Sequence, residues 1–89
     1  MKAIEFSNEL NKKLKLISHK DRKLFKKIEK QLLLFEENPR HPSLRLHKLK
    51  GNLQNVWSIS IDRSYRMVYT EQKNSIYFFD IGTHSEIYN

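Results

Sequence analysis

Cationic, imidazole and phenolic side chains recur in the second half of the chain, between residues 47 and 88. Arg66 lies in a strand-like run, where a guanidinium can grip a phosphate with two hydrogen bonds and oppose the charge of a phosphoryl transition state. His47 and His84 can each act as a general acid or base near neutral pH. Tyr88 can orient a phosphate or stack on a base. These four side chains predict acid–base chemistry on a phosphodiester such as that of RNA.

In such a cleavage the 2′-hydroxyl attacks the adjacent phosphate, one group takes its proton, and another protonates the leaving 5′ oxygen. No metal or other cofactor is expected. Metal binding by His41, His47 and His84 is an alternative, but no pair has helical i, i+4 spacing and no carboxylate cluster accompanies them. Taken one at a time, each histidine also fits a solvated loop position, and Arg66 fits an ordinary exposed strand arginine.

The charge of the chain favours a polyanion or an acidic protein as partner. It has 89 residues with 17 Lys and Arg against 10 Asp and Glu, a net charge of +7. A solvated basic helix surface is the alternative for the lysines of the first half. Cysteine is absent, which excludes disulfides and thiolate metal sites. The longest apolar run, Leu32 to Phe35, is far short of a membrane span. We expect one cytoplasmic domain, residues 1–89, with no membrane partner.

The first half of the chain has the periodicity of two helices. Residues 2–6 predict a short strand, and residues 8–17 predict a first helix from apolar residues at helical spacing. Ser18 is the expected N-cap of a second helix, with Asp21 three residues later as in a capping box. An apolar stripe runs along that helix to about Glu37, and Asn38-Pro39 ends it.

The second half is rich in β-type residues separated by turn signals. Strands are predicted over residues 46–50, 56–61, 65–70 and 75–81, with a turn at Gly51-Asn52. The alternation places Tyr65, Met67 and Tyr69 on one face of a strand and Arg66 on the other. The expected fold is α+β, with an N-terminal helical hairpin packed on a small antiparallel sheet in two layers. No glycine-rich phosphate loop, nucleophile elbow or carboxylate pair is present, which argues against nucleotide hydrolysis and glycosidase chemistry.

The order of these motifs resembles the RelE/ParE superfamily of bacterial toxins. The shared segments are His-Lys-Leu-x-Gly, Tyr-Arg-x-Val-Tyr and Asp-Ile-Gly-Thr-His-x-Glu-Ile-Tyr, and the resemblance covers nearly the whole chain. It is strongest to the RelE and YafQ-like branch, the messenger-RNA interferases of type II toxin–antitoxin systems. The resemblance implies a toxin that cuts messenger RNA in the ribosomal A site and is otherwise held by a cognate antitoxin.

The resemblance also implies a role for individual residues. Arg66 matches the strand arginine that stabilises the phosphate, and His84 matches the general acid or base after the last strand. His47 matches the histidine of the His-Lys-Leu segment, and Tyr88 matches a C-terminal aromatic that positions a base or phosphate. The cations expected to bind RNA are Lys48, Lys50, Arg45 and Arg63.

The chain departs from the family pattern in two places. Some YafQ-like members have a second histidine and an aspartate in the strand that here runs from Ser58 to Asp62 without histidine. Several members also carry an arginine on the last strand, where this chain has Asp80. The roles open to Asp80 are a base, an orienter of His84 and a plain strand-end residue, and of these we favour the orienter. The alternatives are a ParE-like inhibitor of DNA gyrase without nuclease activity, which would not need the two sheet histidines, and an inactive binding module.

Overall fold

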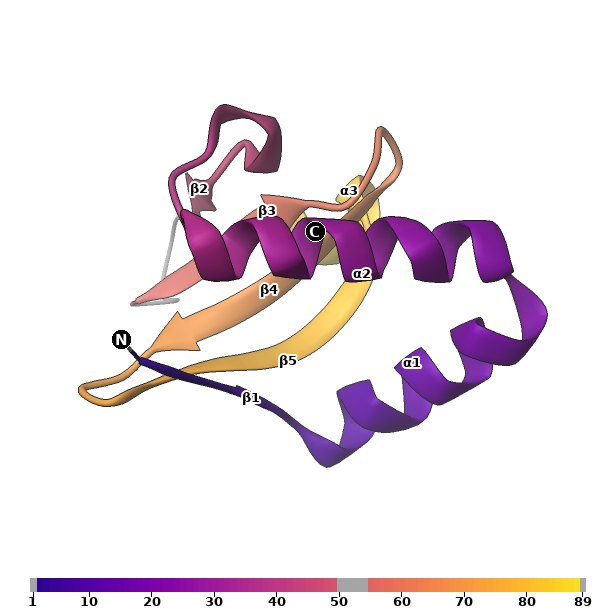
Figure 1. Ribbon diagram of the computed structural model, residues 1–89, viewed down its shortest axis with the longest axis horizontal. Helices are drawn as coiled ribbons and strands as arrows, with labels where there is room; N and C mark the ends of the chain where they lie inside the picture. The colour runs from indigo at the N-terminus through magenta and orange to yellow at the C-terminus, as the bar shows by residue number, and fades with distance from the viewer. Residues whose placement is uncertain (1, 50–54, 89) are drawn as a thin grey trace.

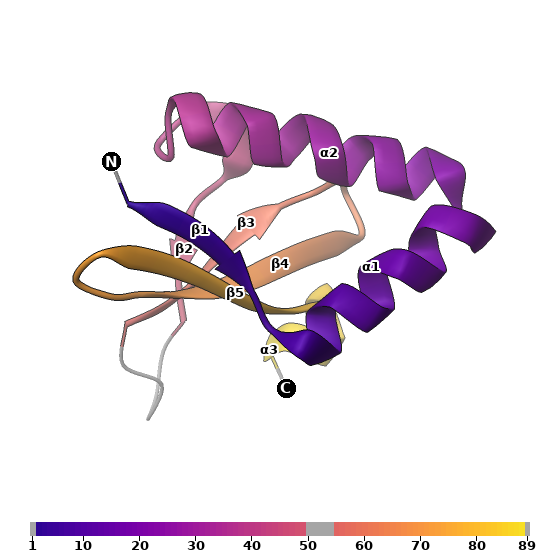
Figure 2. The same ribbon diagram turned by 60° about the horizontal axis from the view of Figure 1, so that its bottom comes forward.

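A five-stranded sheet carries two long helices on one of its faces (Figures 1 and 2). The computed structural model describes residues 2–49 and 55–88. The α+β fold with a helical pair packed on one face of a sheet is as predicted. The elements in chain order are β1 (Ala3–Phe6), α1 (Asn8–Lys20), α2 (Arg22–Glu37), a 3-10 turn η1 (Pro42–Leu44), β2 (His47–Lys48), β3 (Val56–Ser60), β4 (Tyr65–Glu71), β5 (Ser75–Thr83) and α3 (His84–Tyr88).

The sheet is mixed rather than wholly antiparallel. Its strand order is β1-β5-β4-β3-β2, and β2 to β5 form the predicted antiparallel meander. The first strand joins the edge in parallel, with Ala3 opposite Ser75 and Phe6 opposite Phe78. A tight turn forces antiparallel pairing on the strands it joins. No such turn links β1 to β5, because both helices and three strands lie between them.

The break between the helices lies three residues later than predicted. Asp21, not Ser18, caps α2, and its carboxylate accepts a hydrogen bond from the Leu24 amide at 3.1 Å. The first helix continues to Lys20, and the Ser18 hydroxyl donates to the Lys15 carbonyl within its last turns. A carboxylate at an N-cap also suits the positive end of the helix dipole, so Asp21 is the better cap of the two.

The helices bury their apolar stripes against one face of the sheet. Phe35 of α2 lies 5.2 Å from Tyr69 and 5.4 Å from Phe78, measured between ring centroids. Tyr65 and Met67 also pack in this core, as the strand alternation predicted. We call the other side of the sheet the open face. There α3 covers a second, smaller cluster that contains Val68.

Candidate active site

Side chains from four elements meet on the open face. The register of the meander brings them together, because His47 of β2 lies opposite Ser58 of β3, and Ser60 lies opposite Arg66 of β4. The short α3 then folds back over the same face. The side chains that meet are His47, Ser58, Arg66, His84 and Tyr88.

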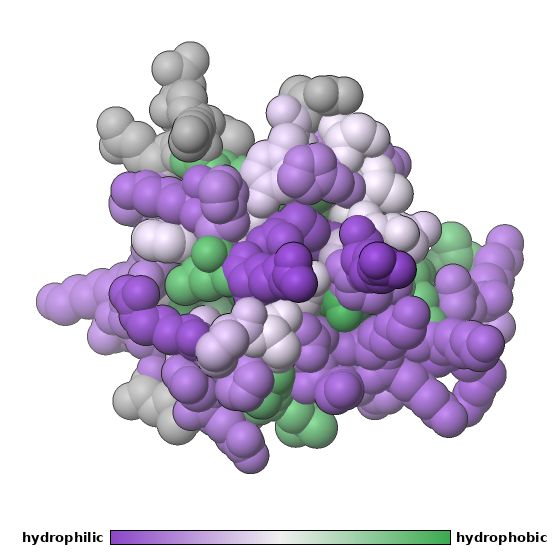
Figure 3. All heavy atoms as spheres, turned by 90° about the horizontal axis from the view of Figure 1, so that it is seen from above, coloured by the Kyte–Doolittle hydropathy of each residue, from purple (hydrophilic) through white to green (hydrophobic). Residues whose placement is uncertain are grey.

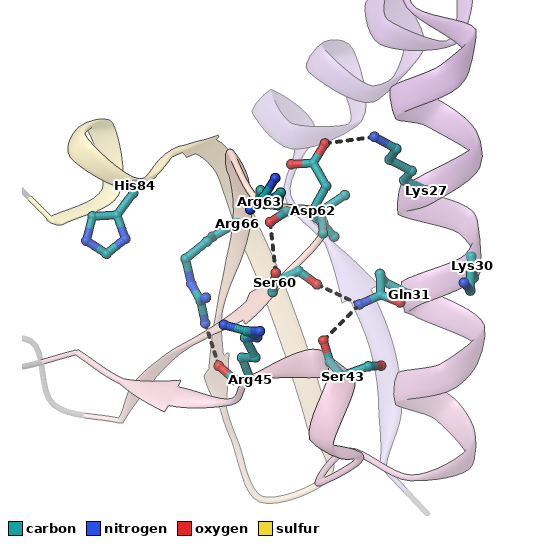
Figure 4. Close-up of a pocket in the computed structure, with 11 residues that line it drawn as sticks. Lys27, Lys30, Gln31, Ser43, Arg45, Ser60, Asp62, Arg63, Arg66 and His84 are labelled. Atoms are coloured by element: carbon teal, nitrogen blue, oxygen red, sulfur yellow. Dashed lines mark hydrogen bonds and ion pairs between the residues drawn. The ribbon is translucent and has the colours of Figure 1, made fainter.

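The guanidinium of Arg66 is held in place by three hydrogen bonds. Its Nε donates to the Ser58 hydroxyl at 2.9 Å, and its Nη2 donates to the Ser58 carbonyl at 3.2 Å and to the Arg45 carbonyl at 2.6 Å. Figure 4 shows the side chain reaching toward the Arg45 backbone. Among the described residues nothing accepts a hydrogen bond from Nη1. Arg66 is therefore oriented by the protein with one nitrogen left to bind an anion.

The ring of Tyr88 lies close to both imidazoles. Its ring centroid is 4.4 Å from that of His84 and 5.8 Å from that of His47, and its hydroxyl is 2.6 Å from the Ser58 hydroxyl. Both imidazoles are exposed, whereas Tyr88 is partly buried. The arrangement presents two exposed imidazoles beside a phenol that is held by a hydrogen bond.

A capping box that the sequence interpretation missed positions His84 and Tyr88. The Thr83 hydroxyl accepts from the Glu86 amide at 3.4 Å, and the Glu86 carboxylate accepts from the Thr83 amide at 2.7 Å. The pattern Thr-x-x-Glu is a helix-start signal. It places His84 and Tyr88 one turn apart on the same helical face. Hydrogen bonding to the carboxylate from Thr83, first of all from its backbone amide, lowers the pKa of the Glu86 carboxyl.

Gly82 allows α3 to lie this close to the sheet. A methyl group at this position would come within 3.2 Å of both the Cβ and the Oε1 of Glu86. A side chain here would require Glu86 to shift by a few tenths of an ångström, and Glu86 is part of the capping box.

A groove of about 740 Å³ leads away from this cluster toward α2 (Figure 4). Arg66 and His84 line one side of it, and Arg45 and Arg63, both predicted to bind RNA, line it as well. The remaining lining residues are Lys27, Lys30, Gln31, Ser43, Ser60, Ile61 and Asp62. Hydrophilic side chains cover most of the face formed by α2, η1 and the β3–β4 turn (Figure 3). The groove is thus lined by five Lys and Arg side chains and one carboxylate.

The one carboxylate of the groove is already engaged. Asp62 accepts hydrogen bonds from the Ser64 and Tyr65 amides, both at 2.8 Å, and its second oxygen is 3.3 Å from Lys27 Nζ. Burial raises the pKa of Asp62, but these hydrogen bonds and Lys27 outweigh it and leave that pKa below its ordinary value. Asp62 therefore stays charged and structural, and most of the positive charge of the groove is free to meet an anion.

Among the described residues, two predicted site residues, Lys48 and Asp80, lie away from this cluster. Lys48 faces away from His47, and its Nζ is 5.7 Å from the centroid of the Trp57 ring, its partner in the register. The Asp80 carboxylate is 2.6 Å from Lys13 Nζ and accepts from the Ile81 amide, and no contact links it to His84 among the described residues. Lys50 and the expected Gly51-Asn52 turn lie outside the described residues.

Two kinds of site are not seen in the part of the chain that the structure describes. Within residues 2–49 and 55–88, no three or more histidines and carboxylates are grouped as metal ligands. No helix in the same ranges has the length and apolar character needed to cross a bilayer.

Comparison with known proteins assigns the chain to a family. Residues 2–89 match the model of a family described as the bacterial toxin of type II toxin–antitoxin system, YafQ. The chain belongs to the YafQ toxin family. A protein of Methanocaldococcus jannaschii named as toxin RelE4 is 31% identical over 90 residues, covering 99% of this chain and 92% of that protein.

Solved structures of related toxins have the same fold. YafQ from E. coli superposes with a TM-score of 0.76 over 100% of both chains, at 20% identity. YoeB from Staphylococcus aureus, solved as a heterotetrameric YoeB–YefM toxin–antitoxin complex, superposes with a TM-score of 0.75 at 29% identity, over 94% of this chain and 98% of that one. The predicted resemblance to the RelE and YafQ-like toxins is therefore confirmed, and the chain is a type II toxin of this group.

Proposed function

We propose that this toxin is a ribosome-dependent endoribonuclease that cleaves messenger RNA without a metal ion. The observation that carries the proposal is the meeting of Arg66, His47, His84 and Tyr88 at one end of a cation-lined groove. A phosphodiester bound there would meet a fixed guanidinium and two exposed imidazoles.

The proposed reaction is a transesterification within the RNA. One imidazole removes the proton of a 2′-hydroxyl, whose oxygen attacks the adjacent phosphorus. Arg66 stabilises the extra negative charge on the phosphoryl oxygens, with its position fixed in advance by its bonds to the protein. The other imidazole protonates the departing 5′ oxygen. The products are a 2′,3′-cyclic phosphate and a 5′-hydroxyl.

The groove supplies the binding site for the RNA backbone on either side of the cut. Arg45 and Arg63 lie at its edge beside Arg66, and Lys27 and Lys30 extend its positive lining along α2. Each phosphate neutralised by such a side chain releases counterions, so binding should weaken steeply as salt is raised. Lys27 and Lys30 are therefore proposed to bind RNA because they line this groove, whereas other helical lysines are ordinary solvated residues.

A cognate antitoxin is the second proposed partner. YoeB, a relative with the same fold, is found in a toxin–antitoxin complex with YefM. A groove with this charge accepts an acidic protein segment for the same electrostatic reason that it accepts RNA. Antitoxin and message would then compete for one surface.

The test is to programme ribosomes with a defined message, add the toxin and map the new ends. Wild type should cut at the A-site codon and leave a 5′-hydroxyl. Arg66→Ala and His84→Ala should not cut, whereas Lys12→Ala, an exposed lysine of α1 outside the groove, should cut normally. A message with a 2′-deoxy nucleotide immediately before the cut should resist wild type, because the attacking oxygen is missing.

Two results would reject the proposal. One is an intact message in ribosomes whose A site is occupied by the wild-type toxin. The other is cleavage of the 2′-deoxy message at the same position. If the message stays intact while supercoiling by DNA gyrase is inhibited, the ParE-like alternative replaces the nuclease.

A further inference from the structure

Ser58 lies at the centre of the candidate active site, although its side chain is chemically the least reactive there. The residue is completely buried, with 0% of its surface exposed. Its hydroxyl contacts Arg66 Nε at 2.9 Å and the Tyr88 hydroxyl at 2.6 Å. Its strand partner is His47. One small side chain thus touches β4 and α3 and lies directly across from the histidine of β2.

The chemistry of these bonds fixes part of their direction. A serine hydroxyl has one proton and two lone pairs, whereas Nε of an arginine can only donate. Ser58 Oγ therefore accepts from Arg66, and its own proton is free to go to the Tyr88 oxygen. A bond from a charged donor polarises the hydroxyl and strengthens that donation. The bonds connect guanidinium, serine and phenol in one chain, and either hydroxyl can be the donor between Ser58 and Tyr88.

Tyr88 carries this connection to both imidazoles. Its hydroxyl is bonded to Ser58, and its ring lies against His84 and His47, at 4.4 Å and 5.8 Å between centroids. With its hydroxyl engaged and its ring close to both imidazoles, Tyr88 is placed to hold the histidines rather than to stack on a base.

We propose that Ser58 is a positioning residue that couples the phosphate-binding Arg66 to the acid–base pair His47 and His84 through Tyr88. It does not touch the RNA. It sets the angle of the guanidinium and the place of the phenol, so that all four groups address one phosphate. This inference rests on the proposed nuclease function for its kinetic consequence, but the physical coupling can be measured without it.

Loss of the Ser58 hydroxyl should leave the fold intact. The last helix is also attached by the Thr83–Glu86 capping box and by Ile87, which packs on the cluster of Leu49, Val56 and Val68. Ser58→Ala keeps the strand and removes only the oxygen. The expected defect is misplacement of Arg66 and Tyr88, not unfolding.

The kinetic test is a double-mutant cycle of Ser58→Ala and Tyr88→Phe on message cleavage. Each single change should lower kcat by about 10- to 100-fold and leave KM within about twofold, since a hydrogen bond that only positions catalytic groups is lost. The double variant should be no slower than the slower single variant, because both remove the same bond. Ser85→Ala, an exposed serine of α3, is the matched control and should match wild type. Multiplicative effects of the two changes, or a Ser58→Ala enzyme with wild-type kcat, would overturn the coupling.

The second test does not depend on activity. The imidazole protons of His47 and His84 lie in the ring current of Tyr88, so their NMR shifts report its position. Ser58→Ala should move both sets of signals, and Ser85→Ala should move neither. Unchanged imidazole shifts in Ser58→Ala refute the positioning role whatever the kinetics show. If both shifts move but wild type cuts no message, the coupling stands and the nuclease proposal fails.

Discussion

Replacement of Arg66 by lysine separates the charge of the guanidinium from its geometry. Arg66 uses Nε and Nη2 for three hydrogen bonds to Ser58 and Arg45, at 2.6 to 3.2 Å. A lysine keeps the positive charge but concentrates its donors on one nitrogen. That nitrogen cannot reach the Ser58 hydroxyl, the Arg45 carbonyl and a phosphate at the same time. The affinity of the variant for RNA should therefore stay close to that of wild type. Its positive charge, however, should not be held next to the phosphoryl oxygens in the transition state.

The expected loss follows from what Arg66 contributes to each step. Removing one preorganised donor to a developing oxyanion typically costs about 100- to 1,000-fold in kcat, and we expect Arg66→Lys to fall near the lower end because the charge remains. The dependence of affinity on salt should not change, since the number of phosphates neutralised is unchanged. Arg66→Ala should instead reduce the slope of log affinity against log salt by about one.

The assay is single-turnover cleavage of message on programmed ribosomes, combined with binding of a 2′-deoxy message over a series of salt concentrations. A wild-type kcat in Arg66→Lys would show that the positive charge alone is sufficient. The fixed geometry of the Arg66 guanidinium would then have no role in catalysis. A reduced salt slope in Arg66→Lys would show that the lysine no longer meets the phosphate, so its low rate would carry no information about geometry. Thermal unfolding of both variants provides the control for misfolding.

Three further predictions test the surroundings of the site. The buried Gln31 donates from Nε2 to two backbone carbonyls, at 2.9 and 3.3 Å, which ties α2 to β3 and to η1. Gln31→Met should therefore destabilise the fold by about 2 kcal/mol and lower Tm by roughly 10 °C, measured calorimetrically. Acidification should release the start of α3, because the pKa of Glu86 is lowered in the fold and the capping box is lost as pH falls through that pKa. The Thr83 amide proton should follow this titration by NMR below the ordinary range of a glutamate, and Glu86→Gln should abolish it. Asp80→Asn should leave the imidazole shift of His84 and the cleavage rate unchanged, because the carboxylate contacts Lys13 instead; a large fall in rate would restore the orienter role.

The fold could be predicted from the sequence wherever one local rule decided the outcome. The alternation of Tyr65, Met67 and Tyr69 was enough to place Arg66 on the open face. The direction of β1 was not accessible in this way, because no local turn constrains it and its pairing with β5 spans the whole chain. The cap of α2 was misplaced because serine and aspartate are both preferred N-cap residues, and only the length of α1 decides between Ser18 and Asp21.

In the candidate site, too, the features set by a local sequence pattern could be predicted, and those set by tertiary contacts could not. The Thr83–Glu86 capping box was legible in the sequence and would have placed His84 and Tyr88 on one face of a helix. The role of Ser58 was not legible. In the sequence it was only the first residue of the stretch from Ser58 to Asp62 that lacks histidine, and its bonds depend on how far α3 folds back over the sheet. Lys27 and Lys30 likewise have no sequence signal that separates them from other helical lysines.

The absence of histidine from β3 has a physical consequence for the proposed chemistry. An imidazole at position 58 would sit beside the Arg66 guanidinium, and its protonation would be opposed by that charge. Serine is neutral at every pH of interest, so it can hold Arg66 and Tyr88 together without titrating. In the proposed mechanism the proton transfers fall to His47 and His84, whose rings lie 5.8 Å and 4.4 Å from the Tyr88 ring between centroids. If the nuclease proposal is right, a serine that does not titrate would hold the orientation of the guanidinium while the imidazoles transfer protons.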